Sequence, residues 1–306
     1  MTKTLCLSVL TTGQRLQGLK DCVQSILEMR PAEQFGIELL IVHNGPDRLD
    51  EVRALFDVED KAQLPIRIIH EEKRGIPFAR NAALDYGVEN GFDYLGFIDD
   101  DGIVDPDWCV QMASMFGRSD VDAVTGPQIP VFPEGSEERF RGAQIYRERR
   151  LPEGARTSWA ATNNVVFSLK LVREFGLAFT ESLHAGGEDK EFFLQYTAAG
   201  GEIVWTSTAV VREVVPFERQ TNEWVRERAL RYGFNGHKID MLVCDRSKAI
   251  GLAMIKCMLY LFKTVTSAFL ALGRSNHHLL DTMAYFNHAK GYWLSLQTKD
   301  FAVKYA

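Results

Sequence analysis

A short apolar run, Tyr94 to Ile98, stops abruptly at three consecutive aspartates, Asp99 to Asp101. Five such residues suit a parallel strand that is covered on both faces, and Gly102 and Pro106 then interrupt the extended backbone. The three carboxylates are therefore expected at the carboxyl end of a strand, where open α/β sheets bind ligands. The run predicts both a parallel sheet and the edge of that sheet that carries the chemistry.

The spacing of the aspartates indicates a cation site. Side chains alternate along an extended segment, so Asp99 and Asp101 can face one cavity while Asp100 points away. Two like charges that lie close need a cation, and hard carboxylate oxygens suit Mg²⁺ or Mn²⁺, which usually also takes oxygens from a substrate diphosphate. The alternative is an acidic turn in solvent that caps a helix beginning near Pro106, because helix N-termini also favour Asp.

The alternation of strand and helix patterns extends over the first half of the chain. Apolar strand patterns cover residues 4–10, 38–43 and 66–70, and helical patterns follow near residues 16–27, 50–56 and 78–86. With the strand at 94–98, this order implies a parallel sheet with right-handed crossovers, so we predict an α/β protein with a doubly wound, mostly parallel sheet. Neither G-x-G-x-x-G nor a Walker A lysine loop occurs, which argues against a dehydrogenase or a P-loop NTPase.

The middle of the chain predicts further strands and one more polar helix start. Residues 121–126 and 160–168 have strand character, residues 127–133 are expected to be an irregular connection, and the charged segment 136–156 is expected at the rim. The predicted strand at residues 160–168 carries Asn163 and Asn164 near its start. Gly186 and Gly187 then open a helix with Glu188 and Asp189 in its first turn, where an acidic cap would also be ordinary.

The composition is that of a globular protein. It is 46% hydrophobic over 306 residues, and its net charge of −6 gives no reason to expect nucleic acid as a partner. The five cysteines include no C-x-x-C pair, so neither a disulfide framework nor a zinc site is indicated, and the cytoplasm is the simplest compartment. The apolar run Leu5 to Leu10 is too short for the core of a signal peptide.

A series of short motifs resembles, in order, those of the family 2 glycosyltransferases, and most closely those of bacterial enzymes that build exopolysaccharide repeat units of the succinoglycan type. The resemblance implies a GT-A type domain over residues 1–240, a nucleotide diphosphate sugar as donor and transfer with inversion at the anomeric carbon. The motifs are Gly75-Ile-Pro-Phe-Ala-Arg-Asn81, Phe97-Ile-Asp-Asp-Asp101, Thr162-Asn-Asn164, Gly187-Glu-Asp189 and Arg228-Ala-Leu-Arg-Tyr232.

The resemblance also implies roles for individual residues. Asp99 would contact the nucleotide. Asp101, together with Asp99, would hold the Mn²⁺ or Mg²⁺ ion that bridges the two phosphates. Asp189 would be the catalytic base. The arginine motif suits phosphate oxygens. The remaining donor contacts would be Thr11, Arg15, His43, Asn44, Arg80, Asn81, Asp100, Arg228 and Arg231. On the acceptor side we expect Asn163, Asn164 and Glu188.

One residue departs from the family pattern in the base-binding region. In other members of the family, the second strand of the sheet usually ends in an aspartate that helps to recognise uracil. In this chain the corresponding strand is residues 38–43, and it ends in His43. An imidazole can still hydrogen-bond to a base edge through either nitrogen. UDP therefore remains the expected donor nucleotide. Tyr232 stands where many members have Trp, which keeps an aromatic side chain there.

The C-terminal region, residues 241–306, is expected to be a helical appendage that associates with a membrane. Residues 248–273 form a long apolar helical pattern, but Lys256 and Lys263 interrupt it, and a span needs about 20 apolar residues with few charges. Together with Lys248 these lysines form a basic stripe that would face anionic headgroups from a helix lying in the membrane interface. The alternative is a helix packed on the catalytic domain. A second helical pattern covers residues 285–296.

These observations predict an inverting, metal-dependent glycosyltransferase that extends a lipid-linked oligosaccharide on the cytoplasmic face of the cell membrane. Two other functions remain open. A sugar-phosphate nucleotidyltransferase also uses a parallel sheet and a metal-binding carboxylate, but it would not account for Glu188, Asp189 and the arginine motif. A non-catalytic module that binds a sugar nucleotide belongs to a different class, and measured turnover would separate it from an enzyme.

Overall fold

The structure, a computed structural model, describes residues 2–56, 64–117, 120–184, 186–272 and 276–298. The chain forms two compact units. The sheet unit comprises residues up to 129 together with 149–184 and 188–213, and the helical unit comprises residues 130–148, 186–187 and those from 214 onward. The boundary expected after residue 240 falls inside the helix Asn222–Val243 (α8), which belongs to the helical unit.

Within the described residues, eight strands form the main sheet, in the order β3-β2-β1-β4-β9-β6-β10-β8. Strand β1 pairs in parallel with β2 and β4, whereas β9 runs antiparallel between β4 and β6. The predicted doubly wound, mostly parallel α/β sheet is thereby confirmed. The strands are β1 (Lys3–Thr11), β2 (Phe35–His43), β3 (Ile66–His70), β4 (Tyr94–Asp99), β6 (Ala123–Thr125), β8 (Arg156–Thr157), β9 (Asn164–Ser168) and β10 (Ile203–Trp205).

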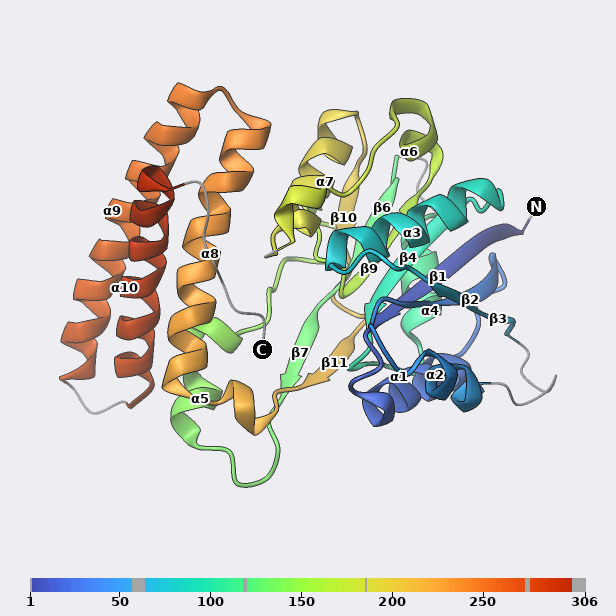
Figure 1. Cartoon of the computed structure of the whole chain (residues 1–306), viewed down its shortest axis with the longest axis horizontal. Helices are drawn as coiled ribbons and strands as arrows, with labels where there is room; N and C mark the ends of the chain where they lie inside the picture. Colours follow the sequence, from blue (N-terminus) through green and yellow to red (C-terminus); the bar gives the residue numbers. More distant parts are fainter. Residues whose placement is uncertain (1, 57–63, 118–119, 185, 273–275, 299–306) are drawn as a thin grey trace. The chain divides into compact units, whose positions relative to one another are not determined.

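Helices cover both faces of this sheet (Figure 1). Successive residues of β1 point to opposite faces, so Leu5 and Leu7 pack under one set of helices and Cys6 under the other. The first set is α1 (Leu16–Glu28), α2 (Leu49–Phe56) and α4 (Trp108–Met115). The second set is α3 (Ile76–Glu89), α6 (Lys170–Phe175) and α7 (Glu188–Ala198).

A second, three-stranded sheet has the order β5-β11-β7. It contains β5 (Gly102–Val104), β7 (Gln128–Val131) and β11 (Val211–Val214). The expectation of an irregular connection at 127–133 was therefore wrong, because β7 lies within it. A short edge strand that follows Pro127 and contains Pro130 lacks the apolar alternation by which strands are predicted from sequence.

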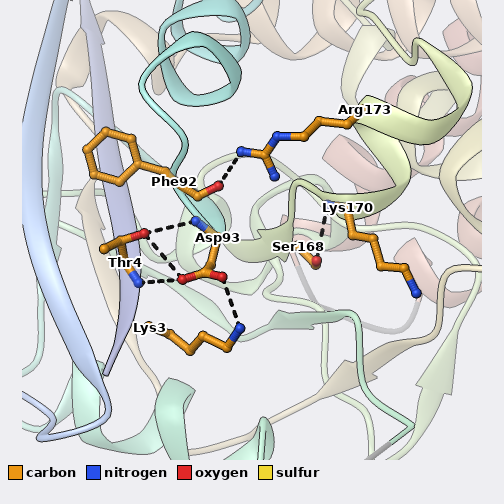
Figure 2. Close-up of polar contacts among 7 residues, drawn as sticks. All are labelled: Lys3, Thr4, Phe92, Asp93, Ser168, Lys170 and Arg173. Atoms are coloured by element: carbon orange, nitrogen blue, oxygen red, sulfur yellow. Dashed lines mark hydrogen bonds and ion pairs between the residues drawn. The ribbon is translucent and has the colours of Figure 1, made fainter. Parts of the chain in front are cut away.

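The start of the main sheet is fastened by one side chain, Asp93, which precedes β4 (Figure 2). Its carboxylate accepts hydrogen bonds from Lys3 Nζ and from the backbone N–H of Thr4, both at 2.9 Å, and its own N–H donates to Thr4 Oγ1 at 3.0 Å. These bonds fix the register of β1 against β4, in which Leu10 lies opposite Asp99. The far ends of the two strands are thereby aligned.

The helical unit contains α5 (Glu138–Gly142), α8 (Asn222–Val243), α9 (Arg246–Ala271) and α10 (Asn276–Gln297). Short 3-10 turns lie at Gln144–Tyr146 and Phe217–Arg219 in this unit and at Glu181–Leu183 in the sheet unit. The charged segment 136–156 was expected at the rim, but Phe140 and Tyr146 are buried in this unit, and Tyr146 stacks on Trp224 at 5.5 Å. Residue 273, the last of the predicted apolar helix, lies outside the described residues.

Candidate active site

The carboxyl ends of three neighbouring strands bring polar side chains to one edge of the main sheet. Thr11 at the end of β1 lies opposite His43 at the end of β2, and Leu10 lies opposite Asp99 at the end of β4. This is the edge at which open α/β sheets bind ligands. The placement agrees with the prediction made from the aspartate run.

Asp100 follows β4 in a turn, and its side chain points into the protein. It is buried, and its carboxylate accepts hydrogen bonds from Thr11 Oγ1 at 2.8 Å and from Arg15 Nη2 at 2.5 Å. The same guanidinium contacts the carboxylate of Asp101. Arg15 thus links the loop after β1 to the aspartate turn, and about half of its side chain remains exposed at 49%.

Asp99 carries the clearest electrostatic signature of the site. Burial and the neighbouring charge of Asp101 raise the pKa of Asp99 to about 7, although Arg80 opposes the shift. Glu213 also contributes, because it lies opposite Gly102 in the pairing of β11 with β5. Sequence reasoning missed Glu213, since only the strand pairing places it next to the aspartate turn.

This surplus of negative charge fits a divalent cation held by Asp99 and Asp101. Among the described residues, His, Cys, Asp and Glu side chains form no group of three or more arranged to hold a metal on their own. That is the usual situation for Mg²⁺ and Mn²⁺, which often take one or two carboxylates and complete their coordination with substrate phosphates and water.

The first turn of α7 carries the second pair of acidic residues, and the two have different surroundings. Glu188 is buried and contacts Arg80 of α3. Burial raises the pKa of Glu188 and the Arg80 guanidinium opposes this. Asp189 is partly exposed, and its carboxylate accepts a hydrogen bond from the backbone N–H of Lys190 at 2.7 Å. Asp189 is therefore the acid of this pair that can meet a substrate.

The end of β2 supports the surrounding loops. His43 is fully buried, and its Nδ1 lies 3.1 Å from Nδ1 of His70. One of these two nitrogens is protonated and donates a hydrogen bond to the other. A Cβ atom on either Gly13 or Gly45 would come within 3.2 Å of His43 Nε2. The imidazole thus fills the space beneath both turns.

The amide of Asn44 is also fully engaged. Its nitrogen donates to the carbonyls of Glu71 and Lys73 at 2.8 and 2.7 Å, and its oxygen accepts from the N–H of Gly75 at 2.9 Å. Asn44 therefore ties the ends of β2 and β3 to the start of α3, whose Arg80 belongs to the site.

Three further asparagines from the sequence motifs make bonds within the protein. Asn81 of α3 bonds through its amide to both backbone groups of Phe179. Asn164 is fully buried, accepts from Trp108 Nε1 at 2.8 Å and donates to two carbonyls, so its N–H groups are used internally. Asn163 contacts the side chain of Gln128.

The arginine motif lies on α8 of the helical unit. Arg228 donates through Nε to the hydroxyl of Tyr232 at 2.8 Å, and its guanidinium stands 4.8 Å from the centre of that ring. Arg231 is three residues further along, so both arginines lie on the same side of the helix. Tyr232 is 44% exposed, so an aromatic surface accompanies the two cations.

A mostly parallel sheet with an acidic turn at the end of β4 and an acidic helix start at α7 defines a GT-A type glycosyltransferase. The family model "Glycosyl transferase family 2" matches residues 9–174, and the related model "Glycosyl transferase family group 2" matches residues 94–296. The chain belongs to glycosyl transferase family 2 and is a glycosyltransferase that uses nucleotide sugars.

The chain is 26% identical over 233 residues to the succinoglycan biosynthesis protein ExoM of Rhizobium meliloti (strain 1021), covering 76% of this chain and 74% of that protein. Among solved structures, it resembles the mannosyltransferase PcManGT from Pyrobaculum calidifontis in complex with GDP-Man and Mn²⁺, with a TM-score of 0.63, 16% identity and coverage of 98% and 89%. It also resembles residues 1–349 of S. aureus TarS in complex with UDP-GlcNAc, with a TM-score of 0.51, 12% identity and coverage of 76% and 66%.

Proposed function

We propose that this chain is an inverting glycosyltransferase that moves a hexose from a UDP-sugar to a lipid-linked oligosaccharide during assembly of a surface polysaccharide. The observation that carries the proposal is the separation of two acidic groups in the sheet unit. Asp99 and Asp101 form one group at the end of β4, and Asp189 stands at the start of α7. Arg80 contacts Glu188 and also acts electrostatically on Asp99.

On the donor side, Asp99 and Asp101 would hold Mn²⁺ or Mg²⁺ against the two phosphates. Arg15 keeps Asp100 and Asp101 in place and has half of its side chain in solvent, where a phosphate oxygen can reach it. Thr11 donates to Asp100 and so fixes the end of β1 against the same turn. The manganese complex of the structural relative PcManGT agrees with this choice of cation.

On the acceptor side, Asp189 would act as general base. An acceptor hydroxyl attacks the anomeric carbon from the face opposite the diphosphate, the new C–O bond forms as the bond to the diphosphate breaks, and the hydroxyl proton passes to the Asp189 carboxylate. The hydrogen bond from the N–H of Lys190 orients that carboxylate. The start of a helix also favours its negative charge.

The identity of donor and acceptor rests on the relatives. ExoM belongs to succinoglycan biosynthesis, which supports a sugar polymer as the product, and the TarS complex supports a uridine nucleotide. Because PcManGT was solved with GDP-Man, a guanosine diphosphate sugar must be tested beside the UDP-sugars. A lipid-linked acceptor would require the enzyme to work at the cytoplasmic surface of the inner membrane, as a peripherally associated protein.

The test is turnover of the wild type and of Asp189→Asn with UDP-glucose, UDP-galactose and GDP-mannose in the presence of Mn²⁺. We expect one UDP-hexose to be consumed. Asp189→Asn should bind that donor as the wild type does, by calorimetry, while its kcat falls by about 10²-fold or more, because a general base typically contributes that much. Near-normal turnover of Asp189→Asn would show that another residue is the base. If the wild type turns over none of the three donors, the proposed function is wrong.

A further inference from the structure

One face of α9 consists almost entirely of exposed apolar side chains. Among the described residues, α9 is long and apolar enough to cross a membrane by length and composition, yet only 11% of its most apolar window is buried within the protein. Phe262 and Phe269 are 67% and 69% exposed. The other exposed apolar residues of this face are Met254, Ile255, Met258, Leu259, Leu261, Val265, Leu270 and Leu272.

The opposite face of α9 packs on α8 and α10 and is small or polar. Its fully buried members are Ala249, Ala253 and Ser267. Ser267 donates to the carbonyl of His278, and Tyr260 stacks on His288 at 3.7 Å. This helix therefore turns its polar side to protein and its apolar side outward, the reverse of a helix on the surface of a water-soluble bundle.

The three helices of this bundle also approach one another closely at glycines. Gly233 of α8 and Gly291 of α10 allow close approach, since a Cβ on Gly233 would lie 2.0 Å from the carbonyl oxygen of His288. Small residues at helix contacts, with polar groups between the helices, are typical of bundles in contact with lipid. On its exposed side α10 adds Leu279, Phe286 and Trp293, which follow one another at seven-residue intervals.

The lysines occupy different positions from those expected of a headgroup-facing stripe. Lys256 is turned into the bundle, where its Nζ donates to both carboxylate oxygens of Asp240 at 2.6 and 2.8 Å. Lys263 stands over the rings of Tyr260 and Tyr285 at 5.0 and 5.7 Å. The stripe prediction was therefore wrong for Lys256, and from Met254 to Leu272 no charged side chain interrupts the exposed face, a length of about 27 Å.

The sequence of α9 and α10 adds charge complementarity to an anionic surface. Between residues 246 and 297, the acidic side chains are confined to Asp281, which is buried and accepts from the N–H of Gln144. The same stretch carries several Lys and Arg residues in a chain of net charge −6. Lys248 is exposed near the start of α9. An apolar face accompanied by cations fits the boundary between headgroups and acyl chains.

We infer that the exposed face of α9 is a membrane-docking surface, and that it inserts flat into the acyl region of the bilayer just below the headgroups. The inference rests on the proposed use of a lipid-linked acceptor. The helix lies parallel to the bilayer because α8 and α10 pack along its other side and carry charged groups such as Asp240 and Lys290. Apolar burial carries most of the binding, and headgroup charge contributes the smaller part.

The experiment is flotation of the full chain with vesicles of pure phosphatidylcholine and of phosphatidylcholine with phosphatidylglycerol, at low and high salt. The wild type should bind both, with a modest gain on the anionic vesicles that salt removes. The double variant Phe262→Glu/Phe269→Glu should lose more than tenfold in partition to both. The matched control is Phe175→Glu/Phe217→Glu, which adds the same charge at two positions that are each 53% exposed, and it should bind as the wild type does.

Thermal unfolding of each variant reports whether it is folded, and donor turnover in solution is measured on the same samples. Vesicle binding by Phe262→Glu/Phe269→Glu at the wild-type level would overturn the inference. A wild type that does not bind vesicles would also overturn the inference. If that wild type is a dimer in solution and Phe262→Glu/Phe269→Glu is a monomer, the exposed face of α9 binds a second copy of the chain instead of a membrane. Vesicle binding without donor turnover would sink the proposed function and leave the docking surface intact.

Discussion

Arg80 of α3 and Glu188 of α7 form an ion pair in which both side chains are almost out of solvent, at 9% and 3% exposure. The charge of Arg80 also acts on Asp99 at the end of β4. One buried cation is therefore shared between the aspartate turn and the first turn of the helix that carries Asp189. A substitution of Arg80 should therefore change the surroundings of both Asp99 and Glu188.

The first prediction concerns the stability of this pair. Arg80→Met and Glu188→Gln should each destabilise the fold by about 3 kcal/mol, because each leaves the other partner buried without compensation. The double variant should lose less than the sum of the two, since the Arg80–Glu188 pair is then absent and neither partner of it is left buried alone. Urea unfolding of the wild type and the three variants measures this coupling.

A matched control uses the exposed pair of Arg156 and Asp120, whose side chains are 57% and 49% exposed. Arg156→Met and Asp120→Asn should each change the unfolding free energy by less than about 1 kcal/mol, with no measurable coupling. Additive effects of Arg80→Met and Glu188→Gln would contradict the assigned pair.

Much of the sheet unit could be predicted from sequence because its signals are local. The apolar run 94–98 became the buried strand β4, and residues 66–70 became β3 with those bounds. The antiparallel direction of β9 was not predictable, because a short buried strand has the same apolar composition in either direction. The three-stranded sheet was missed for a related reason, since its short strands are held by partners distant in sequence.

The contacts around the proposed site could not be predicted from the sequence. The motifs brought Asp99, Asp101 and Asp189 into consideration, but only the fold shows that Arg80 reaches Glu188 and that Glu213 lies beside the aspartate turn. The orientation of Lys256 was also beyond sequence, because a lysine on an apolar helix fits a headgroup or an internal carboxylate equally well. Its partner Asp240 lies on another helix.

The second prediction is that transfer depends on a divalent cation held by the aspartate turn. Chelation with EDTA should abolish turnover, and added Mn²⁺ should restore it. Asp101→Asn keeps the size of the side chain but removes a charged ligand, so binding of Mn²⁺ together with UDP should weaken more than tenfold by calorimetry. Asp105→Asn is the control, because Asp105 lies nearby on the chain but pairs with Arg212. Full activity in EDTA would refute the metal role.

The last prediction follows from the buried imidazole of His43. Burial lowers the pKa of His43 below its usual 6.5, and the adjacent His70 lowers it further. In the interval between the lowered value and about 6.5, the unfolded chain binds a proton that the folded chain does not, so stability rises with pH there. The contribution is complete above about pH 6.5 and is lost as the pH falls through the lowered value.

Protonation of His43 would also place a charge beneath the turns at Gly13 and Gly45, next to the strand ends where we propose that the nucleotide binds. Donor affinity should therefore fall together with stability between pH 7 and pH 5. His43→Gln, which cannot take up a proton, should show a smaller loss of unfolding free energy over this range, whereas His184→Gln, at an exposed position, should behave as the wild type does. If His43→Gln and the wild type lose stability in parallel as the pH falls, another group controls the acid sensitivity.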